Sequence, residues 1–283
     1  MKKIILLPNK EKDPALSLSL RVLSVLQTFC TTVYTESANG DLIAAGATPY
    51  AADSFPTDGE LLLVLGGDGT MLHAASLAVE YDIPLLGVNI GRLGYLASVE
   101  PSEINALSAL SDGTYTEQKR MLLDVSVEKK NGEVLFLGHA LNEAVIDGRG
   151  HLADLRLYEK QSYIDYRADG LIVATPTGST AYSLSAGGPV LDESMDAICV
   201  TPICPRSFFS RSLLFSENAE LRISNVSTRA SGVRLLMDGC TDIDLDNGDT
   251  VLVARSARRV RILNIKPRHL LDVLSTKMNT QHF

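Results

Sequence analysis

Apolar and polar residues follow one pattern in the first part of the chain and another in the rest. Over about the first hundred residues, short apolar runs alternate with longer amphipathic segments. The clearest run, Leu61 to Leu65, holds five apolar residues without interruption, which is typical of a strand covered on both faces. We predict further strands at residues 4–7, 31–35 and 85–88, and helices at residues 13–29, 70–81 and 102–110. This alternation predicts a parallel sheet with helices on its faces.

Helix-capping residues, prolines and glycines indicate where these elements begin and end. Asp13 is a good N-cap residue, and Pro14 is favoured at the first helical position, so the first helix is predicted to open there. Gly113 is predicted to end the helix after Leu110. Pro49 and Pro56 predict a loop before the strand that starts at Leu61.

From about Gln118 the pattern changes to a period of two. Apolar and polar residues alternate over residues 123–128, and residues 130–132 are typical of a turn. Residues 134–137 then form the returning strand of a predicted hairpin. The alternation recurs at residues 155–158 and 243–245, and Asn247-Gly248 predicts a second hairpin turn. Short strands separated by turns over about 140 residues predict an all-β, sandwich-like domain. The segment from Pro267 to Met278 is predicted to be helical.

The two patterns predict two domains with the active site between them. The first is an α/β domain over residues 1–115 with a parallel sheet and a glycine-rich phosphate loop. The second is a β-rich domain over residues 116–264.

Charge and cysteine content exclude several classes. The chain has 26 Lys and Arg against 34 Asp and Glu, a net charge of −8, which argues against nucleic acid or an anionic membrane as a partner. The apolar run after the first lysines, Ile4 to Leu7, is too short for a signal peptide, and no stretch approaches the length of a membrane span. The four cysteines form no C-x-x-C pair, so we expect no zinc site and a reducing, cytoplasmic location.

The first candidate site is Gly66-Gly67-Asp68-Gly69-Thr70, between a predicted buried strand and a predicted helix. Glycines let backbone N–H groups approach an anion, and the helix N-terminus attracts negative charge, so Gly66, Gly67, Gly69 and Thr70 form a candidate phosphate loop. Asp68 is out of place there unless it binds Mg²⁺ or accepts a proton from an attacking hydroxyl; alternatively it only caps the helix. His73, one turn later, either faces the loop or is an ordinary surface or core histidine.

Two further segments hold polar residues in unusual density. Between Asp169 and Pro189 an apolar run leads into a loop rich in hydroxyl groups, where small polar side chains suit ribose and phosphate oxygens and Tyr182 offers a face for a ring. An ordinary capped helix start explains only part of that loop. Asn142 and Glu143 lie among apolar residues; they can turn to one ligand only at a bulge or a strand end, and otherwise they are polar positions of an edge strand.

Missing motifs narrow the choice of enzyme class. No Gly-Lys dipeptide occurs, so there is no Walker A lysine. The glycines at 87, 91 and 94 do not fit the dinucleotide fingerprint of dehydrogenases, and no G-x-S-x-G nucleophile elbow occurs.

Taken together, these segments resemble the NAD kinase family, whose members phosphorylate the adenosine-ribose 2′-hydroxyl of NAD to give NADP. The matching pieces stand in family order over nearly the whole chain; they are residues 66–70, 87–89 through 94–96, 142–143, 169–188, 202–205 and 238–239. The long piece is the most specific, because lipid kinases related to diacylglycerol kinase share the Gly-Gly-Asp-Gly-Thr loop.

The resemblance implies a phosphotransferase with an alcohol acceptor, with NAD and ATP as substrates and Mg²⁺ or another divalent metal as cofactor. Asp68 would be the general base, near the metal and the triphosphate, with Gly69 and His73 beside it. Asn142 and Glu143 would hold the dinucleotide, Arg167 and Asp169 would lie around its nicotinamide half, and His151 fits a position where relatives often place a basic residue. The adenine and ribose pocket would be lined by Thr177, Thr180, Ala181, Tyr182, Ser183, Leu184 and Ser185. The resemblance also implies that residues 265–283 pack back on the first domain as a C-terminal helix, and that residues 116–264 bind NAD and form oligomers. A homodimer or homotetramer with shared active sites is implied.

Two positions depart from the family pattern, and two alternative functions stay open. Cys240 stands where many bacterial relatives have Gln, and Arg206 where they commonly have His, which puts polar contacts from Cys240 in doubt. The alternatives are a lipid kinase of the diacylglycerol kinase type and a non-catalytic dinucleotide-binding module. The sequence leaves open the phosphoryl donor, the use of NADH, regulation by NADPH and the subunit count.

Overall fold

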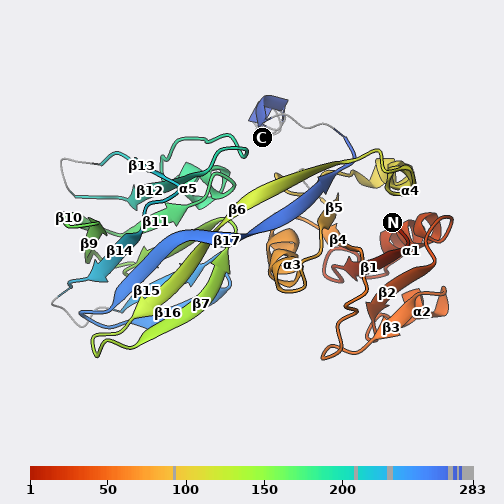
Figure 1. The fold of residues 1–283 in the computed structure, drawn as a ribbon, viewed down its shortest axis with the longest axis horizontal. Coiled ribbons are helices and arrows are strands. Elements are labelled where there is room, and N and C mark those ends of the chain that lie inside the picture. Colours follow the sequence, from red (N-terminus) through yellow and green to blue (C-terminus); the bar gives the residue numbers. More distant parts are fainter. Residues whose placement is uncertain (92–93, 207–209, 228–231, 267–269, 273, 276–283) are drawn as a thin grey trace. The chain divides into compact units, whose positions relative to one another are not determined.

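The structure, a computed structural model, describes residues 1–91, 94–206, 210–227, 232–266, 270–272 and 274–275. The chain divides into two compact units, one made of Met1–Lys119 with Val260–Phe283 and the other of Arg120–Arg259 (Figure 1). The strands β6 (Thr116–Glu128) and β17 (Thr250–Asn264) each run from one unit into the other. The roles predicted for the two domains stay a prediction.

The first unit is a parallel α/β sheet, as the sequence predicts. Its strands follow the order β3-β2-β1-β4-β5-β17, and the pairs from β3 to β5 and the β5–β17 pair are all parallel. The elements are β1 (Lys3–Pro8), α1 (Ser17–Leu26), β2 (Thr32–Glu36), α2 (Gly40–Ala44), β3 (Thr48–Tyr50), β4 (Leu61–Gly66), α3 (Asp68–Glu80), β5 (Leu85–Asn89), the 3-10 helix η1 (Pro101–Ser108) and α4 (Ala109–Asp112). All six residues of β4 are buried, as expected for a central strand covered on both faces.

The order of these strands indicates where a ligand would bind. In register, Pro8 of β1 lies beside Leu65 of β4, and Gly66 lies beside Asn89 of β5, so the carboxyl ends of three strands meet at one edge. Along the chain, the sheet grows in one direction from β1 through β2 and β3, and in the other from β4 through β5. Open α/β sheets bind ligands outside the carboxyl ends at such a reversal.

The start of α1 differs from the prediction. The helix begins at Ser17 instead of Pro14, because Leu16 before it adopts a left-handed conformation at φ 51°. Asp13 still serves the helix: its Oδ2 accepts hydrogen bonds from the Ser19 N–H and Oγ at 2.9 and 2.7 Å. The predicted N-cap is therefore wrong, since Leu16 holds that position, but the Asp13 carboxylate still accepts hydrogen bonds from the first turn.

Two short elements were not predicted. α2 and β3 occupy the segment that was expected to be a loop, and Pro49 lies inside β3. A proline is tolerated there because β3 is the edge strand of its sheet. The helix predicted at residues 102–110 is η1 followed by α4, and it ends as predicted at Gly113, which adopts φ 70°.

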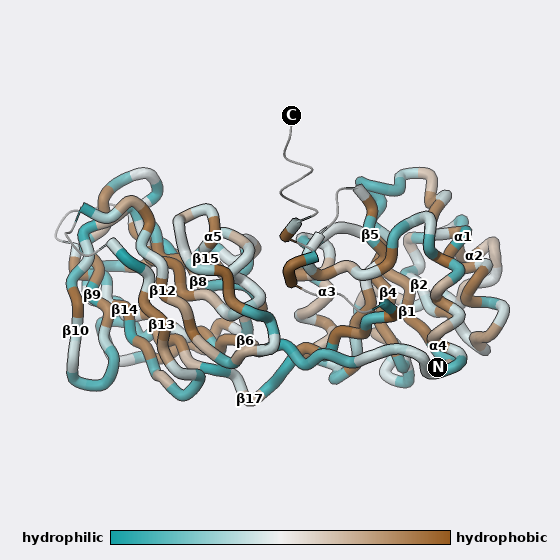
Figure 2. The backbone as a smooth tube through the Cα atoms, turned by 90° about the horizontal axis from the view of Figure 1, so that it is seen from above, coloured by the Kyte–Doolittle hydropathy of each residue, from teal (hydrophilic) through white to brown (hydrophobic). Residues whose placement is uncertain are grey.

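The second unit consists of two antiparallel sheets, which agrees with the predicted sandwich-like class. One sheet has the order β10-β9-β14-β17-β6-β7 and the other β13-β12-β11-β8-β15-β16. The further elements are β7 (Val134–Ala140), β8 (Glu143–Asp147), β9 (Ala153–Glu159), β10 (Ser162–Ala168), β11 (Gly170–Ala174), η2 (Gly178–Thr180), α5 (Tyr182–Ser185), β12 (Ala197–Ile203), β13 (Leu213–Ser216), β14 (Leu221–Asn225), β15 (Val233–Met237) and β16 (Thr241–Leu245). One buried core draws residues from both sheets, and Figure 2 shows hydrophobic colour along these strands.

One predicted hairpin is confirmed and the other is wrong. β6 and β7 pair antiparallel around the turn at Gly132, with Glu128 opposite Val134. The Asn247-Gly248 turn does not join paired strands, since β16 pairs with β15 and β17 pairs with β14. A turn signal predicts a reversal of the chain, but it does not say that the next strand joins the same sheet.

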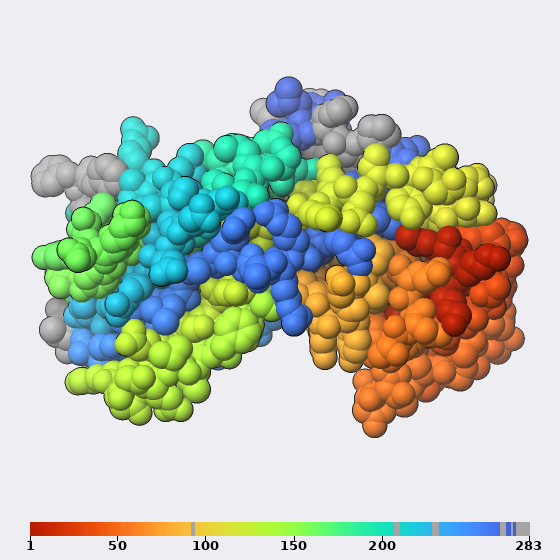
Figure 3. All heavy atoms as spheres, viewed as in Figure 1, coloured from red at the N-terminus to blue at the C-terminus, as the bar shows by residue number. Residues whose placement is uncertain are grey.

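The remaining segments complete the description. β7 is an edge strand, seen in yellow-green at the surface in Figure 3, and its Val134 and Phe136 are exposed. The predicted C-terminal helix falls mostly outside the described residues; residues 270–272 and 274–275 are helical, and the return of this helix to the first domain stays a prediction. Within the described residues, none of the helices is long and apolar enough to cross a membrane.

Candidate active site

The glycine-rich loop joins β4 to α3 at the carboxyl edge of the parallel sheet. β4 ends at Gly66, and α3 begins at Asp68, so the free N–H groups of the first helical turn face this edge. A Cβ at Gly66 would overlap the side chain of Thr70, and one at Gly67 would lie 2.6 Å from the Lys12 amine. Gly66 is therefore glycine for steric reasons, whereas nothing lies within 4 Å of a Cβ at Gly69, and a lysine from the β1–α1 loop lies beside Gly67.

Asp68 is tied to a different segment from its own helix. Its Oδ2 accepts a hydrogen bond from the Tyr95 N–H at 2.9 Å, and its Oδ1 accepts one from the Leu96 N–H at 3.0 Å. A Cβ at Gly94 would overlap Oδ1, so only glycine fits at that point. Asp68 is itself the first residue of α3, and the N-cap, Gly67, makes no side-chain cap bond. This geometry does not match a helix cap; it holds a half-buried carboxylate in one orientation beside the loop.

A cleft of about 630 Å³ opens at the carboxyl ends of β1 and β2, along one flank of α3. Gly69, Thr70 and His73 line it together with Asn9. The Asn9 Nδ2 donates to the Thr70 Oγ1 at 2.8 Å and so joins the β1–α1 loop to the glycine-rich loop. His73 is exposed and lies in this cleft. The sequence analysis missed Asn9, although Pro8-Asn9-Lys10 directly follows a buried strand.

Asn142 and Glu143 meet the condition that the sequence analysis set for them. Asn142 lies just before β8 and Glu143 is its first residue, so the pair stands at a strand end. Both are buried, with 9% and 7% of their surfaces exposed. Burial and the charge of Asp238 raise the pKa of Glu143 to about 7, against a smaller opposite effect of the Tyr182 N–H, which bonds its carboxylate. One oxygen of Glu143, Oε2, is buried without a hydrogen-bond partner among the described residues.

The hydroxyl-rich loop packs directly on this pair. The Thr175 Oγ1 donates to the Leu141 carbonyl at 2.6 Å, and the Thr175 N–H donates to the Asn142 carbonyl at 2.9 Å. A Cβ at Gly178 would overlap the Asn142 carbonyl, which requires glycine there. Ser183 is buried and shares a hydrogen bond with Thr201 at 2.9 Å, so it supports the loop from behind.

The rest of the predicted pocket divides into buried and open positions. Thr177 is buried, and the Thr180 Oγ1 donates to its carbonyl at 3.1 Å. Tyr182 and Leu184 are exposed, by 45% and 38%, as is Ser185, while Ala181 is partly exposed. The exposed side chains offer an apolar and aromatic surface for a planar group.

Acidic groups surround the Tyr182 phenol. Burial raises its pKa, and the charges of Asp147, Cys204, Asp169 and Glu143 raise it further. Asp169 is therefore within electrostatic range of Tyr182, and its predicted place around the nicotinamide half stays a prediction. Asp147 was not singled out from the sequence.

His151 and Arg167 both lie at exposed positions. His151 is exposed in the turn between β8 and β9, where its N–H donates to the Gly148 carbonyl at 2.9 Å. Arg167 is exposed on β10, and its Nε lies 3.7 Å from the Asp154 carboxylate. Asp68, Gly69 and His73 belong to the first unit, and all the other predicted binding residues belong to the second.

Asp238 is the main residue that the sequence analysis left without a role. Its carboxylate accepts hydrogen bonds from the N–H groups of Leu141, Asn142 and Glu143. The sequence shows this residue only as part of an Asp-Gly pair after an alternating strand, a pattern that is typical of a simple turn.

Cys240, the departure from the family pattern, is exposed, and its Sγ lies 3.5 Å from the Asp238 carbonyl.

No group of three or more His, Cys, Asp or Glu side chains among the described residues is arranged to hold a metal ion. Mg²⁺ bound to a triphosphate takes one or two carboxylates from a protein and leaves its other positions to phosphates and water. Asp68, a half-buried carboxylate at the phosphate loop, fits such a role.

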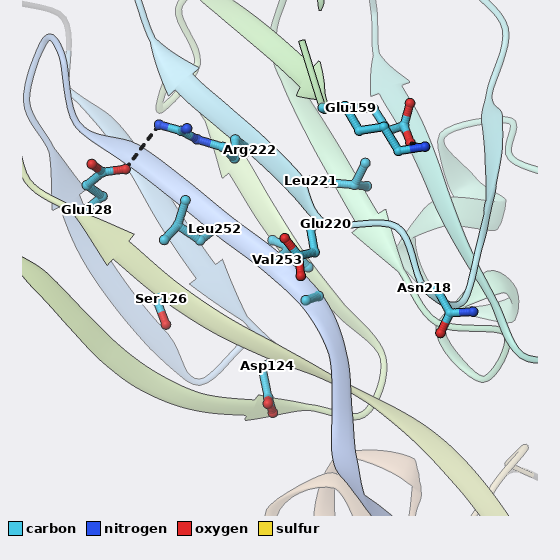
Figure 4. A pocket seen from close by; sticks show the side chains of 12 residues that line it. Asp124, Ser126, Glu128, Glu159, Asn218, Glu220, Leu221, Arg222, Leu252 and Val253 are labelled. Atoms are coloured by element: carbon cyan, nitrogen blue, oxygen red, sulfur yellow. Dashed lines mark hydrogen bonds and ion pairs between the residues drawn. The ribbon is translucent and has the colours of Figure 1, made fainter. Parts of the chain in front are cut away.

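A second groove lies apart from the predicted residues. It is formed on strands β6, β9, β14 and β17, has a volume of about 600 Å³, and is crossed by an ion pair between Arg222 and Glu128 at 3.1 Å (Figure 4). Further acidic side chains, among them Asp124 and Glu220, line it. None of the predicted site residues takes part in it.

Structural neighbours share the fold. The yeast NADH kinase complexed with NADH has a TM-score of 0.86 at 24% identity and covers 100% of this chain and 89% of that one. An NAD kinase from Archaeoglobus fulgidus in complex with ATP has a TM-score of 0.69 at 20% identity, covering 97% and 99%. At these identities the likeness establishes the fold alone.

Sequence relatives carry the comparison further. The ATP-NAD kinase N-terminal domain matches residues 4–115, and the ATP-NAD kinase C-terminal domain matches residues 141–265. The NAD kinase of Natranaerobius thermophilus is 34% identical and covers 98% of this chain and 98% of its own, and that of Symbiobacterium thermophilum is 36% identical and covers 99% of each. Two matching domains and full-length relatives at these identities show that this chain belongs to the NAD kinase family.

Proposed function

We propose that this chain transfers the γ-phosphoryl group of ATP to the 2′-hydroxyl of the adenosine ribose of NAD, with Asp68 as the general base. The hydroxyl oxygen forms a bond to the γ-phosphorus while the bond from that phosphorus to the bridging oxygen breaks. Asp68 accepts the hydroxyl proton, and the products are NADP and ADP. The observation that supports this most directly is the Asp68 carboxylate, fixed by two backbone N–H groups at the start of α3.

Position and charge supply most of the catalysis in this scheme. A ribose hydroxyl is a weak nucleophile at neutral pH, so it has to be oriented toward the phosphorus while its proton is removed. Asp68 cannot rotate freely, because each of its oxygens accepts a hydrogen bond from the chain. A base held in one orientation contributes about 10²–10⁴-fold to such a reaction.

The triphosphate is assigned to the cleft of the first unit. Its walls include Asn9, Thr70 and His73, and the Lys12 amine stands at Gly67 of the loop. Backbone N–H groups at a helix N-terminus and a lysine are the groups that bind phosphate in the absence of a Walker A sequence. Mg²⁺ would be held by the phosphates near Asp68 and would supply positive charge that offsets the charge of the transferring group.

NAD is assigned to the residues of the second unit. Among the described residues, the Oε2 of Glu143 is an acceptor without a donor, which a ribose hydroxyl supplies. Asn142 adds an amide, and the exposed Tyr182 and Leu184 give a surface for a ring.

We extend the proposal to a homodimer or homotetramer in which the exposed side chains of Tyr182 and Leu184 meet an adjoining protomer. We also propose a cytoplasmic location, which agrees with four free thiols.

The decisive experiment compares Asp68→Asn with the unchanged protein, using ATP, Mg²⁺ and NAD and measuring NADP. Turnover should fall by about 10²–10⁴-fold while NAD affinity changes little, because the amide keeps the size but cannot take a proton. Asp41→Asn is the matched control, since Asp41 is also an acidic residue in a first helical turn of the same unit. Unchanged turnover in Asp68→Asn would contradict the proposed base.

The same assay addresses substrate range. Replacing ATP by other triphosphates or polyphosphate, and NAD by NADH, measures which donors and acceptors the site uses. Light scattering of the purified protein with and without NAD measures the oligomeric state, and a strictly monomeric active enzyme would contradict the shared site.

A further inference from the structure

The turn that carries Asn142 and Glu143 is held by one side chain. The Asp238 carboxylate accepts hydrogen bonds from three consecutive N–H groups: Oδ2 from Leu141 at 2.7 Å, and Oδ1 from Asn142 at 2.8 Å and from Glu143 at 3.0 Å. The Asp238 N–H returns a hydrogen bond to the Glu143 carbonyl at 3.1 Å. Four hydrogen bonds therefore fix the backbone of the turn to a single residue.

The backbone conformation of Asp238 allows these four hydrogen bonds to form. Asp238 adopts φ 46° and Gly239 φ 71°, both in the left-handed region, directly after β15. Aspartate tolerates that region better than most residues, and glycine tolerates it freely. An asparagine would fit the space, but its amide nitrogen would face an N–H group where a carboxylate oxygen now accepts.

Asp238 also determines the charge that Glu143 faces. Burial raises the pKa of Asp238, and the three backbone N–H groups oppose that shift. Glu143 stands beside it, with one oxygen that has no hydrogen-bond partner among the described residues. On the other sides of Glu143, β11 presents Ala174, and α5 presents Tyr182, whose pKa is raised and which is therefore neutral near pH 7. Two neighbouring buried carboxyl groups cannot both ionise without cost.

We propose that Asp238 is a positioning residue of the dinucleotide site, which acts through Asn142 and Glu143 by fixing their backbone and by setting the charge state of the Glu143 carboxyl. This inference rests on the proposed binding of NAD ribose by Glu143. A ribose hydroxyl donates more strongly to a carboxylate than to a carboxylic acid. Binding of NAD therefore favours release of the Glu143 proton, and Asp238 together with burial determines the pH at which that happens.

The test is calorimetric titration of the full chain with NAD between pH 5.5 and 8.5. For the unchanged protein, affinity should rise by up to about tenfold per pH unit and level off above about pH 7, with a proton released on binding at lower pH. In Asp238→Asn the levelling-off should move to lower pH, because the facing charge is gone while the burial of Glu143 remains. Affinity at pH 8.5 should fall about tenfold, because the turn is held less firmly.

Asp249→Asn is the matched control. Asp249 is also buried and also fixes a turn in the second unit, accepting hydrogen bonds from the N–H groups of Lys130 and Asp246 and from the Lys129 amine. It should lower the melting temperature without changing the pH dependence of NAD binding. If it shifted that dependence as Asp238→Asn does, the effect would be general loosening and the proposal would be wrong.

A further variant keeps the test decisive if Asp238→Asn does not fold. Glu143→Gln cannot titrate, so it should remove both the pH dependence and the proton release while the turn stays intact. Proton release that persists in Glu143→Gln, or a pH dependence that is unchanged in Asp238→Asn, would overturn the proposal. NADP formation is measured in parallel on the unchanged protein: its absence would refute the proposed reaction, whereas the binding titrations judge Asp238 independently.

Discussion

At the scale of single residues, each unit holds a candidate carboxylate, and the two have unlike surroundings. Asp68 is half-buried and accepts two backbone hydrogen bonds, one on each oxygen. Glu143 is buried, faces another carboxylate and has an oxygen without a hydrogen-bond partner in the part of the chain that the structure describes. The first arrangement holds the side chain in one orientation, and the second makes ionisation costly until a ligand supplies a hydrogen-bond donor.

The buried Glu143 predicts a pH-dependent cost to stability. Its pKa is about 7 in the folded chain against an ordinary 4.5, so the folded state binds more protons between these values. Stability contributed by the protonated form is complete below about pH 4.5 and is lost as the pH rises through 7. Glu143→Gln should therefore gain stability relative to the unchanged protein over this range, on the order of 3 kcal/mol, since one pKa unit corresponds to about 1.4 kcal/mol.

Urea unfolding without ligand at pH 5 and pH 8 measures this difference. Glu133→Gln, at an exposed position in the turn between β6 and β7, is the control and should follow the unchanged protein at both values. An equal stability gain for Glu143→Gln at both pH values would show that Glu143 does not titrate in this range.

At the scale of elements, the loop at residues 94–96 is expected to control Asp68. A Cβ at Gly94 would overlap the Asp68 Oδ1, so Gly94→Ala should displace the carboxylate from the Tyr95 and Leu96 N–H groups. Turnover should fall about 10²-fold, since a misplaced base loses most of its effect, while NAD affinity measured by calorimetry is retained. Gly40→Ala is the control, because nothing lies within 4 Å of a Cβ at that position. Equal turnover in the two variants would separate the loop from catalysis.

The elements also show where sequence reasoning reaches its limit. Leu61–Leu65 was recognisable because a strand buried on both faces needs only apolar residues. β3 was missed because three residues around a proline at a sheet edge have no pattern of their own. The partner of β16 could not be predicted, because the turn at Asn247 defines a reversal and pairing depends on the whole core.

The same limit holds for the candidate site. The glycine-rich loop and the pair Asn142-Glu143 were found because unusual residue types stand next to one another in the chain. Asp238 binds a segment 95 to 97 residues away, and Lys12 reaches Gly67 from another loop. Neither relation has a local signature, so only three-dimensional packing brings these residues to the site.

At the scale of the whole molecule, each unit has a core of its own. One buried cluster contains β1 and β4 residues such as Ile4 and Leu63, and another contains residues of both antiparallel sheets, such as Leu123 and Val173. The chain joins the units through β6 and β17. The residues assigned to the triphosphate belong to the first unit and those assigned to NAD belong mainly to the second, so each ligand has its own part of the chain to stabilise.

Hydrogen exchange should reveal this division. NAD alone is expected to slow exchange at residues 141–143 and 175–186, because it fills the unpartnered acceptor of Glu143 and covers the exposed part of the loop. A non-hydrolysable ATP analogue with Mg²⁺ is expected to slow exchange at residues 9–12 and 67–70, whose N–H groups line or adjoin the cleft. Glu143→Gln should weaken the first effect and leave the second unchanged, which controls for general stabilisation. Protection by NAD that centres on residues 9–12 would mean that the two substrates have been assigned to the wrong units.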